Sequence, residues 1–210
     1  MLANLPIAEF LAKTAAATAV PGGGPVAALS AATAAGLVEM VANLTFGKKG
    51  FESVAEAMQA IADGARTLRE SLIRDMDRDA EAYTRVLEAY RLPKANEEAR
   101  ELRRAAIEAA FKEAATVPLE VAEKARVVLD LAGKVITGGY PNAATDGVVG
   151  ALLARTAGLS ALYNVRINLA SIGDKAFGQR LLNRVEMIEA DLIQKEQSIL
   201  AAVERTYPPD

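Results

Sequence analysis

Apolar residues recur at the spacing of an α-helix along nearly the whole chain. Near the C-terminus, charged residues separate a set of apolar positions spaced by three, four or sums of these: Phe177, Leu181, Val185, Ile188, Leu192, Ile199 and Val203. This pattern is typical of an amphipathic helix, and the alternation of a β-strand is hard to find. Capping and stop signals place helices at about 5–17, 25–46, 52–91, 96–132, 142–169 and 174–205. We therefore expect an all-α fold, an up-and-down bundle of about six long helices.

The second of these helices is apolar on every side. Its sequence from Val26 to Phe46 is VAALSAATAAGLVEMVANLTF, which is long enough to cross a membrane. Glu39 and Asn43 in its C-terminal half, together with its many small residues, argue against a membrane span. A buried helix of roughly 30 Å would be hard to cover on all sides within one small chain. The sequence therefore predicts a homodimer.

Composition limits the domain organisation and the partners. The 210 residues contain no linker rich in Ser, Gly or Pro, so we expect a single domain over 1–210. Hydrophobic residues make up 51% of the chain but aromatic residues only 5%, which predicts an interior of Ala, Leu, Val and Ile. The net charge is −3 and the basic residues are scattered, which argues against a nucleic-acid partner.

The absence of Cys and His restricts the chemistry. A thiol nucleophile, a Ser-His-Asp triad, a structural zinc site and an imidazole base are all excluded, so acid-base chemistry falls to Asp, Glu, Lys or Tyr. No disulfide is possible, and the first residues, MLANLPIAEF, show no basic segment followed by an apolar one. We expect a cytoplasmic protein.

A glycine-rich stretch, VPGGGPVAA at 20–28, comes at the start of the apolar helix. Gly22, Gly24 and Ala27 loosely fit the G-x-G-x-x-A pattern, but no β-strand precedes them, which excludes a Rossmann site. GKKG at 47–50 lacks the glycine spacing and the hydroxyl residue of a Walker loop. Two interpretations stay open. The stretch is either a tight turn between helices or a helix N-terminus whose free N–H groups bind an anion or a flat polar ring.

A carboxylate lies on the apolar face of the helix at 52–91. Asp79 falls between Met76 and Tyr83 at helical spacing and is expected to point inward, whereas Asp75 and Asp77 are expected on other faces. Burying a carboxylate costs several kcal/mol unless it is paired. Asp79 is therefore either a structural partner for an Arg or an acid-base group with a raised pKa.

A third group of polar residues follows GGYP at 138–141. Asp146 lies in the first turn of a helix after Asn142, where a carboxylate also stabilises the helix dipole. Asn164 and Asn168 are i, i+4 neighbours and form one polar spot. Asp146 and Asn164 would lie about 27 Å apart on a straight helix, so they cannot act on one reacting atom within one chain.

The same reasoning separates the glycine stretch from Lys48 and Lys49, which lie at the opposite end of the second helix. An antiparallel dimer would bring the two ends together.

Six motifs in order carry a resemblance that covers nearly the whole chain. They are PGGGPVAALSAA, MVANLTFGKKGF, DRDAEAYTRVLEAYRLPK, VPLEVAEKA, NAATDGVVGALL and LYNVRINL. The chain resembles the formiminotransferase-cyclodeaminase C-terminal domain and the stand-alone methenyltetrahydrofolate cyclohydrolases. The resemblance implies an all-α homodimer that acts on a one-carbon tetrahydrofolate derivative, with no metal and no cofactor. It favours a functional role for the glycine stretch and for Asp79. Pro25 departs from the small residue usual in the family and is expected to stiffen the loop.

The resemblance implies hydrolysis of 5,10-methenyltetrahydrofolate to 10-formyltetrahydrofolate. Asp79 or Asp146 is the expected acid-base group. The expected substrate contacts are Gly22, Gly23 and Gly24 with the pterin, Lys48 and Lys49 with the glutamyl carboxylates, and Asn142, Asn164 and Asn168 with other polar groups or water. Pro21 and Tyr83 are also expected to bind the substrate. The two lysines are equally explained as a solvated helix C-terminus. The alternatives are ring closure of 5-formiminotetrahydrofolate with loss of ammonia, and a non-catalytic helical dimer that binds folate or a protein.

Overall fold

The computed structural model describes residues 1–206, and every regular element in that range is helical. The six α-helices are α1 (Ile7–Thr14), α2 (Gly23–Thr45), α3 (Ala55–Arg91), α4 (Glu97–Gly138), α5 (Ala144–Leu169) and α6 (Lys175–Thr206). Three short 3-10 helices, η1 (Leu2–Asn4), η2 (Glu52–Val54) and η3 (Pro141–Ala143), precede α1, α3 and α5. The expectation of an all-α fold is confirmed for this part of the chain.

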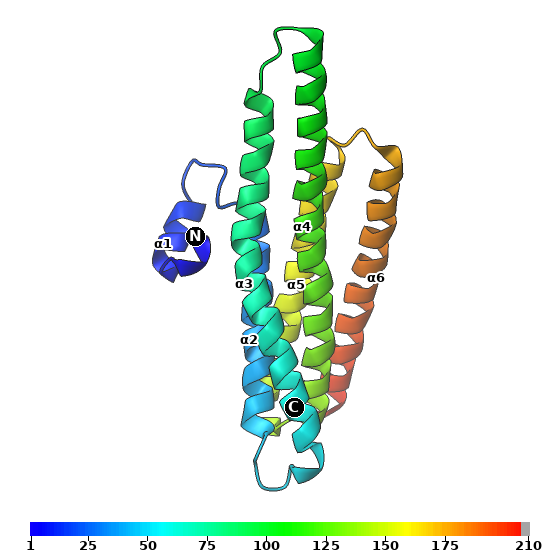
Figure 1. Ribbon diagram of the computed structural model, residues 1–210. Helices are drawn as coiled ribbons and strands as arrows, with labels where there is room; N and C mark the ends of the chain where they lie inside the picture. The colour runs from blue at the N-terminus through cyan, green and yellow to red at the C-terminus, as the bar shows by residue number, and fades with distance from the viewer. Residues whose placement is uncertain (207–210) are drawn as a thin grey trace.

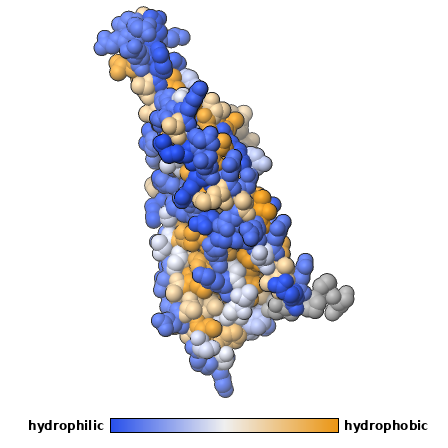
Figure 2. Space-filling model, turned by 90° about the vertical axis from the view of Figure 1, so that its right-hand side faces the viewer, coloured by the Kyte–Doolittle hydropathy of each residue, from blue (hydrophilic) through white to orange (hydrophobic). Residues whose placement is uncertain are grey.

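The long helices run alternately up and down (Figure 1). α2 packs against α3 and α5, and α4 packs against the same two helices, so these four surround one core. α6 lies against α4 and α5. The hairpin between α3 and α4 extends beyond the other helices, and its tip is covered mainly by hydrophilic residues (Figures 1 and 2).

Two of the expected helices differ in length from those observed. α1 has only 8 residues and is not one of the long helices. α4 continues past residue 132, because Val135 and Ile136 are also buried and extend its apolar face. α4 also continues through Pro118, an internal proline that removes one backbone hydrogen bond.

The core is built largely from alanine. On α2, residues such as Ala28, Ala31 and Ala35 have no exposed surface, which lets the neighbouring helices approach closely. As expected for so long an apolar helix, one small chain does not cover it on all sides, and one stripe with exposed apolar side chains remains. The stripe contains Val26, Met40 and Leu44 on α2 and continues onto the adjacent α5 with Val149, Leu152, Tyr163 and Ile167.

Two segments, Gly23–Thr45 and Pro141–Leu169, are long and apolar enough to span a membrane by length and composition alone. Buried core helices of soluble proteins meet the same criterion, and α2 is mostly buried within the bundle. The absence of a membrane span stays a prediction from the sequence.

Candidate functional site

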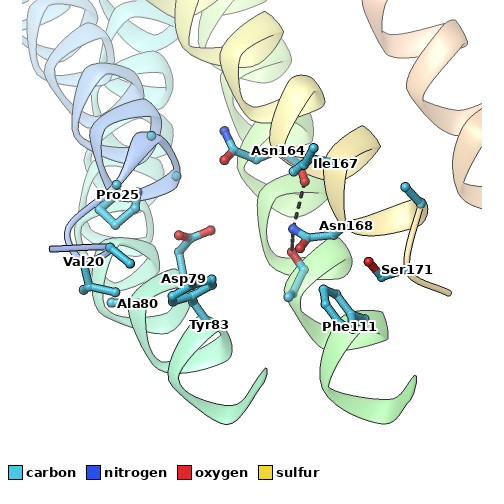
Figure 3. Close-up of a pocket in the computed structure, with 16 residues that line it drawn as sticks. Val20, Pro25, Asp79, Ala80, Tyr83, Phe111, Asn164, Ile167, Asn168 and Ser171 are labelled. Atoms are coloured by element: carbon cyan, nitrogen blue, oxygen red, sulfur yellow. Dashed lines mark hydrogen bonds between the residues drawn. The ribbon is translucent and has the colours of Figure 1, made fainter. Parts of the chain in front are cut away.

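A cavity of about 510 Å³ lies where the N-terminus of α2 meets α3, α4 and the C-terminal part of α5 (Figure 3). It is lined by Ala19, Val20, Gly22, Gly23, Gly24, Pro25, Asp79, Ala80, Tyr83, Phe111, Ala114, Asn164, Ile167, Asn168, Ala170 and Ser171. Its volume is in the range of small-molecule binding sites. The cavity brings together seven of the residues proposed from sequence: Gly22, Gly23, Gly24, Asp79, Tyr83, Asn164 and Asn168.

The glycine stretch forms the first turn of α2. Gly22 is the N-cap, and the N–H groups of Gly23 and Gly24 have no acceptor among the described residues. The stretch is thus a helix N-terminus at a cavity, with backbone donors available to a ligand. Pro25 occupies the third helical position, where its fixed φ suits the first turn and its missing N–H would have had no helical partner.

The carboxylate of Asp79 packs directly on the backbone of Gly24. A Cβ atom at Gly24 would lie 2.1 Å from Oδ2 of Asp79 and 2.3 Å from its Oδ1, distances that no side chain can tolerate. Asp79 comes from the middle of α3 and points across the cavity toward α5 (Figure 3). The absence of a side chain at Gly24 is therefore what allows the carboxylate to occupy this position.

Asp79 has the electrostatics of an acid-base group. Burial, together with the smaller effect of the nearby charge of Asp75, raises its pKa from 3.8 to about 6. No described residue donates a hydrogen bond to the Asp79 carboxylate, so of the two interpretations left open the structure does not support a structural Arg partner. The carboxylate can change protonation state near neutral pH.

Asp75 is the structural carboxylate of this region. It is 1% exposed, and it accepts hydrogen bonds from Lys124 of α4 and from Arg78. The expectation that Asp75 lies away from the buried face is therefore wrong. α3 is covered by α2 on one side and by α4 on another, so its buried surface is wider than one apolar stripe.

Two asparagines face Asp79 from α5. Asn164 donates through Nδ2 to the carbonyl of Ser160 at 2.9 Å and lies next to Gly23. Asn168 donates through Nδ2 to the carbonyls of Ala114 and Asn164, both at 2.8 Å (Figure 3). The polar spot predicted from their spacing is part of the cavity wall.

Apolar side chains complete the cavity. Tyr83 of α3, Phe111 of α4 and Ile167 of α5 line it, and Ile167 is 72% exposed. Phe111 and Ile167 are not predictable from the sequence as site residues, because a helical apolar pattern does not distinguish a cavity wall from a packed core. A flat ring could lie among these side chains with its polar edge toward Asp79.

The remaining candidates lie outside the cavity. Lys48 places its Nζ 3.5 Å from the ring centroid of Tyr140, and Asn142 donates to the Tyr140 hydroxyl at 2.8 Å. These contacts form a polar group near the C-terminus of α2, at the opposite end from the glycines. The predicted separation within one chain is confirmed.

The last three candidate residues also lie outside the cavity. Lys49 follows Lys48 in the exposed turn after α2, and Asp146 lies in the first turn of α5. Pro21 is buried and lines a neighbouring cavity together with Val20 and Asp77.

Comparison with known proteins identifies the family. A sequence model described as "Formiminotransferase-cyclodeaminase" matches residues 6–187. The chain belongs to the formiminotransferase-cyclodeaminase family. A methenyltetrahydrofolate cyclohydrolase of Methylorubrum extorquens is 38% identical over 192 residues, which cover 91% of this chain and 92% of that protein.

Other members of this family extend the comparison. The formimidoyltransferase-cyclodeaminase of Mus musculus is 29% identical over 195 residues, and the match spans 93% of this chain but 36% of the mouse protein. The crystal structure of a formiminotetrahydrofolate cyclodeaminase from Thermotoga maritima has 31% identity and a TM-score of 0.89, covering 98% of this chain and 99% of that one. The bundle described above is thus the fold of a solved family member.

Proposed function

We propose that this protein hydrolyses 5,10-methenyltetrahydrofolate to 10-formyltetrahydrofolate. The observation that carries the proposal is the carboxylate of Asp79, which has a pKa of about 6 and lies on the helix N-terminus in the cavity. The full-length similarity to a protein named methenyltetrahydrofolate cyclohydrolase supports the choice of reaction.

The substrate needs little activation, because the carbon of its cyclic amidinium is already electrophilic. Asp79 takes a proton from water as the water oxygen bonds to that carbon. The new hydroxyl then loses its proton as the C=O bond forms and the bond from the carbon to N5 breaks. N5 takes the proton that Asp79 had accepted, and the formyl group stays on N10. The reaction consumes one water and releases one proton. It requires neither a metal nor a cofactor.

The neighbouring groups have matching roles in this scheme. The N–H groups of Gly23 and Gly24 donate to a polar atom of the pterin. The aromatic ring of Tyr83 contacts its face, and Asn164 and Asn168 orient the ring or the attacking water.

Ring closure of 5-formiminotetrahydrofolate with loss of ammonia is the second candidate. The similarity to the Thermotoga maritima protein, which is named formiminotetrahydrofolate cyclodeaminase, favours it. 5,10-Methenyltetrahydrofolate is the substrate of the first reaction and the product of the second, so the same carboxylate would serve either one.

We further propose that the protein is a homodimer in the cytoplasm. The exposed apolar stripe on α2 and α5 supports dimerisation, because exposed apolar patches on a soluble protein often mark a protein–protein interface. A two-fold axis across the stripe would run α2 antiparallel to its copy. The cavity of one chain would then lie near Lys48, Lys49, Asn142 and Asp146 of the other. The lysines would bind the glutamyl carboxylates.

Dimerisation is tested by placing a charge on the stripe. Leu44 is 49% exposed, so Leu44→Glu should leave the fold intact and reduce the mass measured by sedimentation to that of a monomer. A wild-type protein that sediments as a monomer would exclude the dimer.

The reaction is tested by absorbance with each folate in turn. A cyclohydrolase removes the chromophore of 5,10-methenyltetrahydrofolate faster than buffer does, whereas a cyclodeaminase generates it from 5-formiminotetrahydrofolate and releases ammonia. Binding of 5-formyltetrahydrofolate without turnover of either substrate would indicate the non-catalytic alternative.

A further inference from the structure

Pro118 lies inside α4 and changes the hydrogen bonding of the helix at one carbonyl. Proline has no N–H, so the carbonyl of Ala114, four residues earlier, loses its helical donor. The proline ring also displaces that carbonyl from the helix axis. Both residues are buried, and Ala114 lines the cavity. A buried carbonyl without a donor is costly, so another donor is expected there.

The missing donor comes from α5. Nδ2 of Asn168 donates to the Ala114 carbonyl at 2.8 Å and, with its second hydrogen, to the carbonyl of Asn164 at 2.8 Å (Figure 3). Both hydrogens of the amide are therefore engaged. The Oδ1 atom of Asn168 accepts no hydrogen bond from the described residues, and the side chain lines the cavity.

This arrangement fixes the orientation of the amide. A flipped Asn168 would place Oδ1 against two carbonyl oxygens, which is repulsive and leaves both without their donor. The cavity therefore presents an acceptor, and not a donor, at this position. Such an acceptor favours a ligand with an N–H group over one with a carbonyl or ring nitrogen lone pair.

We propose that Pro118 is a positioning residue, which acts through the Ala114 carbonyl to hold Asn168 as an acceptor for an N–H group of the folate ring. The inference rests on the proposed folate site. Pro118 itself lies outside the cavity lining, whereas Ala114 and Asn168 are part of it, so Pro118 affects a ligand only through residues such as these.

The test measures binding of 5-formyltetrahydrofolate to wild type, Pro118→Ala, Asn168→Ala and the double variant. In Pro118→Ala, the N–H of the new alanine donates to the Ala114 carbonyl within the helix. The hydrogen bond from Asn168 to the same carbonyl is therefore weakened. We expect Pro118→Ala to raise the dissociation constant about three- to tenfold, as for one weakened hydrogen bond. It should also raise the melting temperature, because the helix regains a backbone bond. KM should rise similarly while kcat changes little. Pro6→Ala, at an exposed helix start, is the control.

The double variant separates positioning from general packing. If Pro118 acts through Asn168, then Pro118→Ala has no further effect on binding in the Asn168→Ala background. An unchanged dissociation constant for Pro118→Ala, or an equal effect in both backgrounds, would overturn the proposal.

A measurement without ligand keeps this test apart from the proposed function. Hydrogen exchange of the Asn168 side-chain amide, followed by NMR, should be slow in the wild type and at least about tenfold faster in Pro118→Ala. Equal exchange rates would refute the positioning role even if the protein binds no folate. Slow exchange in the wild type together with no folate binding would refute the proposed function and the recognition of an N–H group. It would leave the positioning role of Pro118 intact.

Discussion

Asp79→Asn should make the protein more stable at neutral pH while removing its activity. The native state holds the pKa of Asp79 at about 6, against an ordinary value of 3.8. Between these values the folded chain binds more protons than the unfolded chain, so stability falls as the pH rises from about 4 to 6. The difference of about two pKa units corresponds to about 3 kcal/mol in the free energy of unfolding above pH 6.

Urea unfolding at pH 4 and pH 7.5, at a fixed protein concentration, measures this difference. The amide has no charge to desolvate, so the variant should gain up to about 3 kcal/mol over the wild type at pH 7.5 and little at pH 4. Asp63→Asn is the control, because Asp63 is an exposed acid of the same helix that bonds to Gln59 and Arg66. A gain of equal size at both pH values, or a variant less stable at pH 7.5, would refute the argument.

Three further predictions follow from the same region. Gly24→Ala should lower kcat/KM about 100-fold, because the new Cβ displaces the Asp79 carboxylate, whereas Gly178→Ala, where nothing lies within 4 Å, should leave turnover unchanged. Lys124→Met should cost about 3 kcal/mol in urea unfolding, since it leaves the buried Asp75 with one cationic partner; wild-type stability would exclude that role. The pH profile of kcat/KM should rise through about pH 6, because the base acts ionised, and a profile flat from pH 5 to 8 would contradict it.

The arrangement of the helices follows from local signals in the sequence. The apolar period located five long helices, and short loops between them allow only antiparallel neighbours. Asn96 caps α4 through the N–H of Ala99, as its position before a Glu-rich turn indicates. The end of α4 expected at residue 132 comes too early, because the buried residues Val135 and Ile136 continue the helix to Gly138.

The contents of the cavity were predictable only in part. Asp79 stands out as a carboxylate on an apolar face, and the glycines as a bare helix start, so both were found. Their direct contact through Gly24 depends on how α2 and α3 pack, and no pattern within either helix contains it. Phe111 and Ile167 likewise reach the cavity through tertiary packing of α4 and α5. Asp75 was misjudged because its partner Lys124 lies 49 residues away in the sequence.

The central claim is that the Asp79 carboxylate carries the reaction. The most direct measurement compares kcat for 5,10-methenyltetrahydrofolate in wild type, Asp79→Asn and the Asp63→Asn control, with the buffer rate subtracted. Removing a general base should lower kcat by about 10²- to 10⁴-fold in Asp79→Asn, and Asp63→Asn should match the wild type. Asp79→Asn turning over at the wild-type rate, with folate binding intact, would contradict the account.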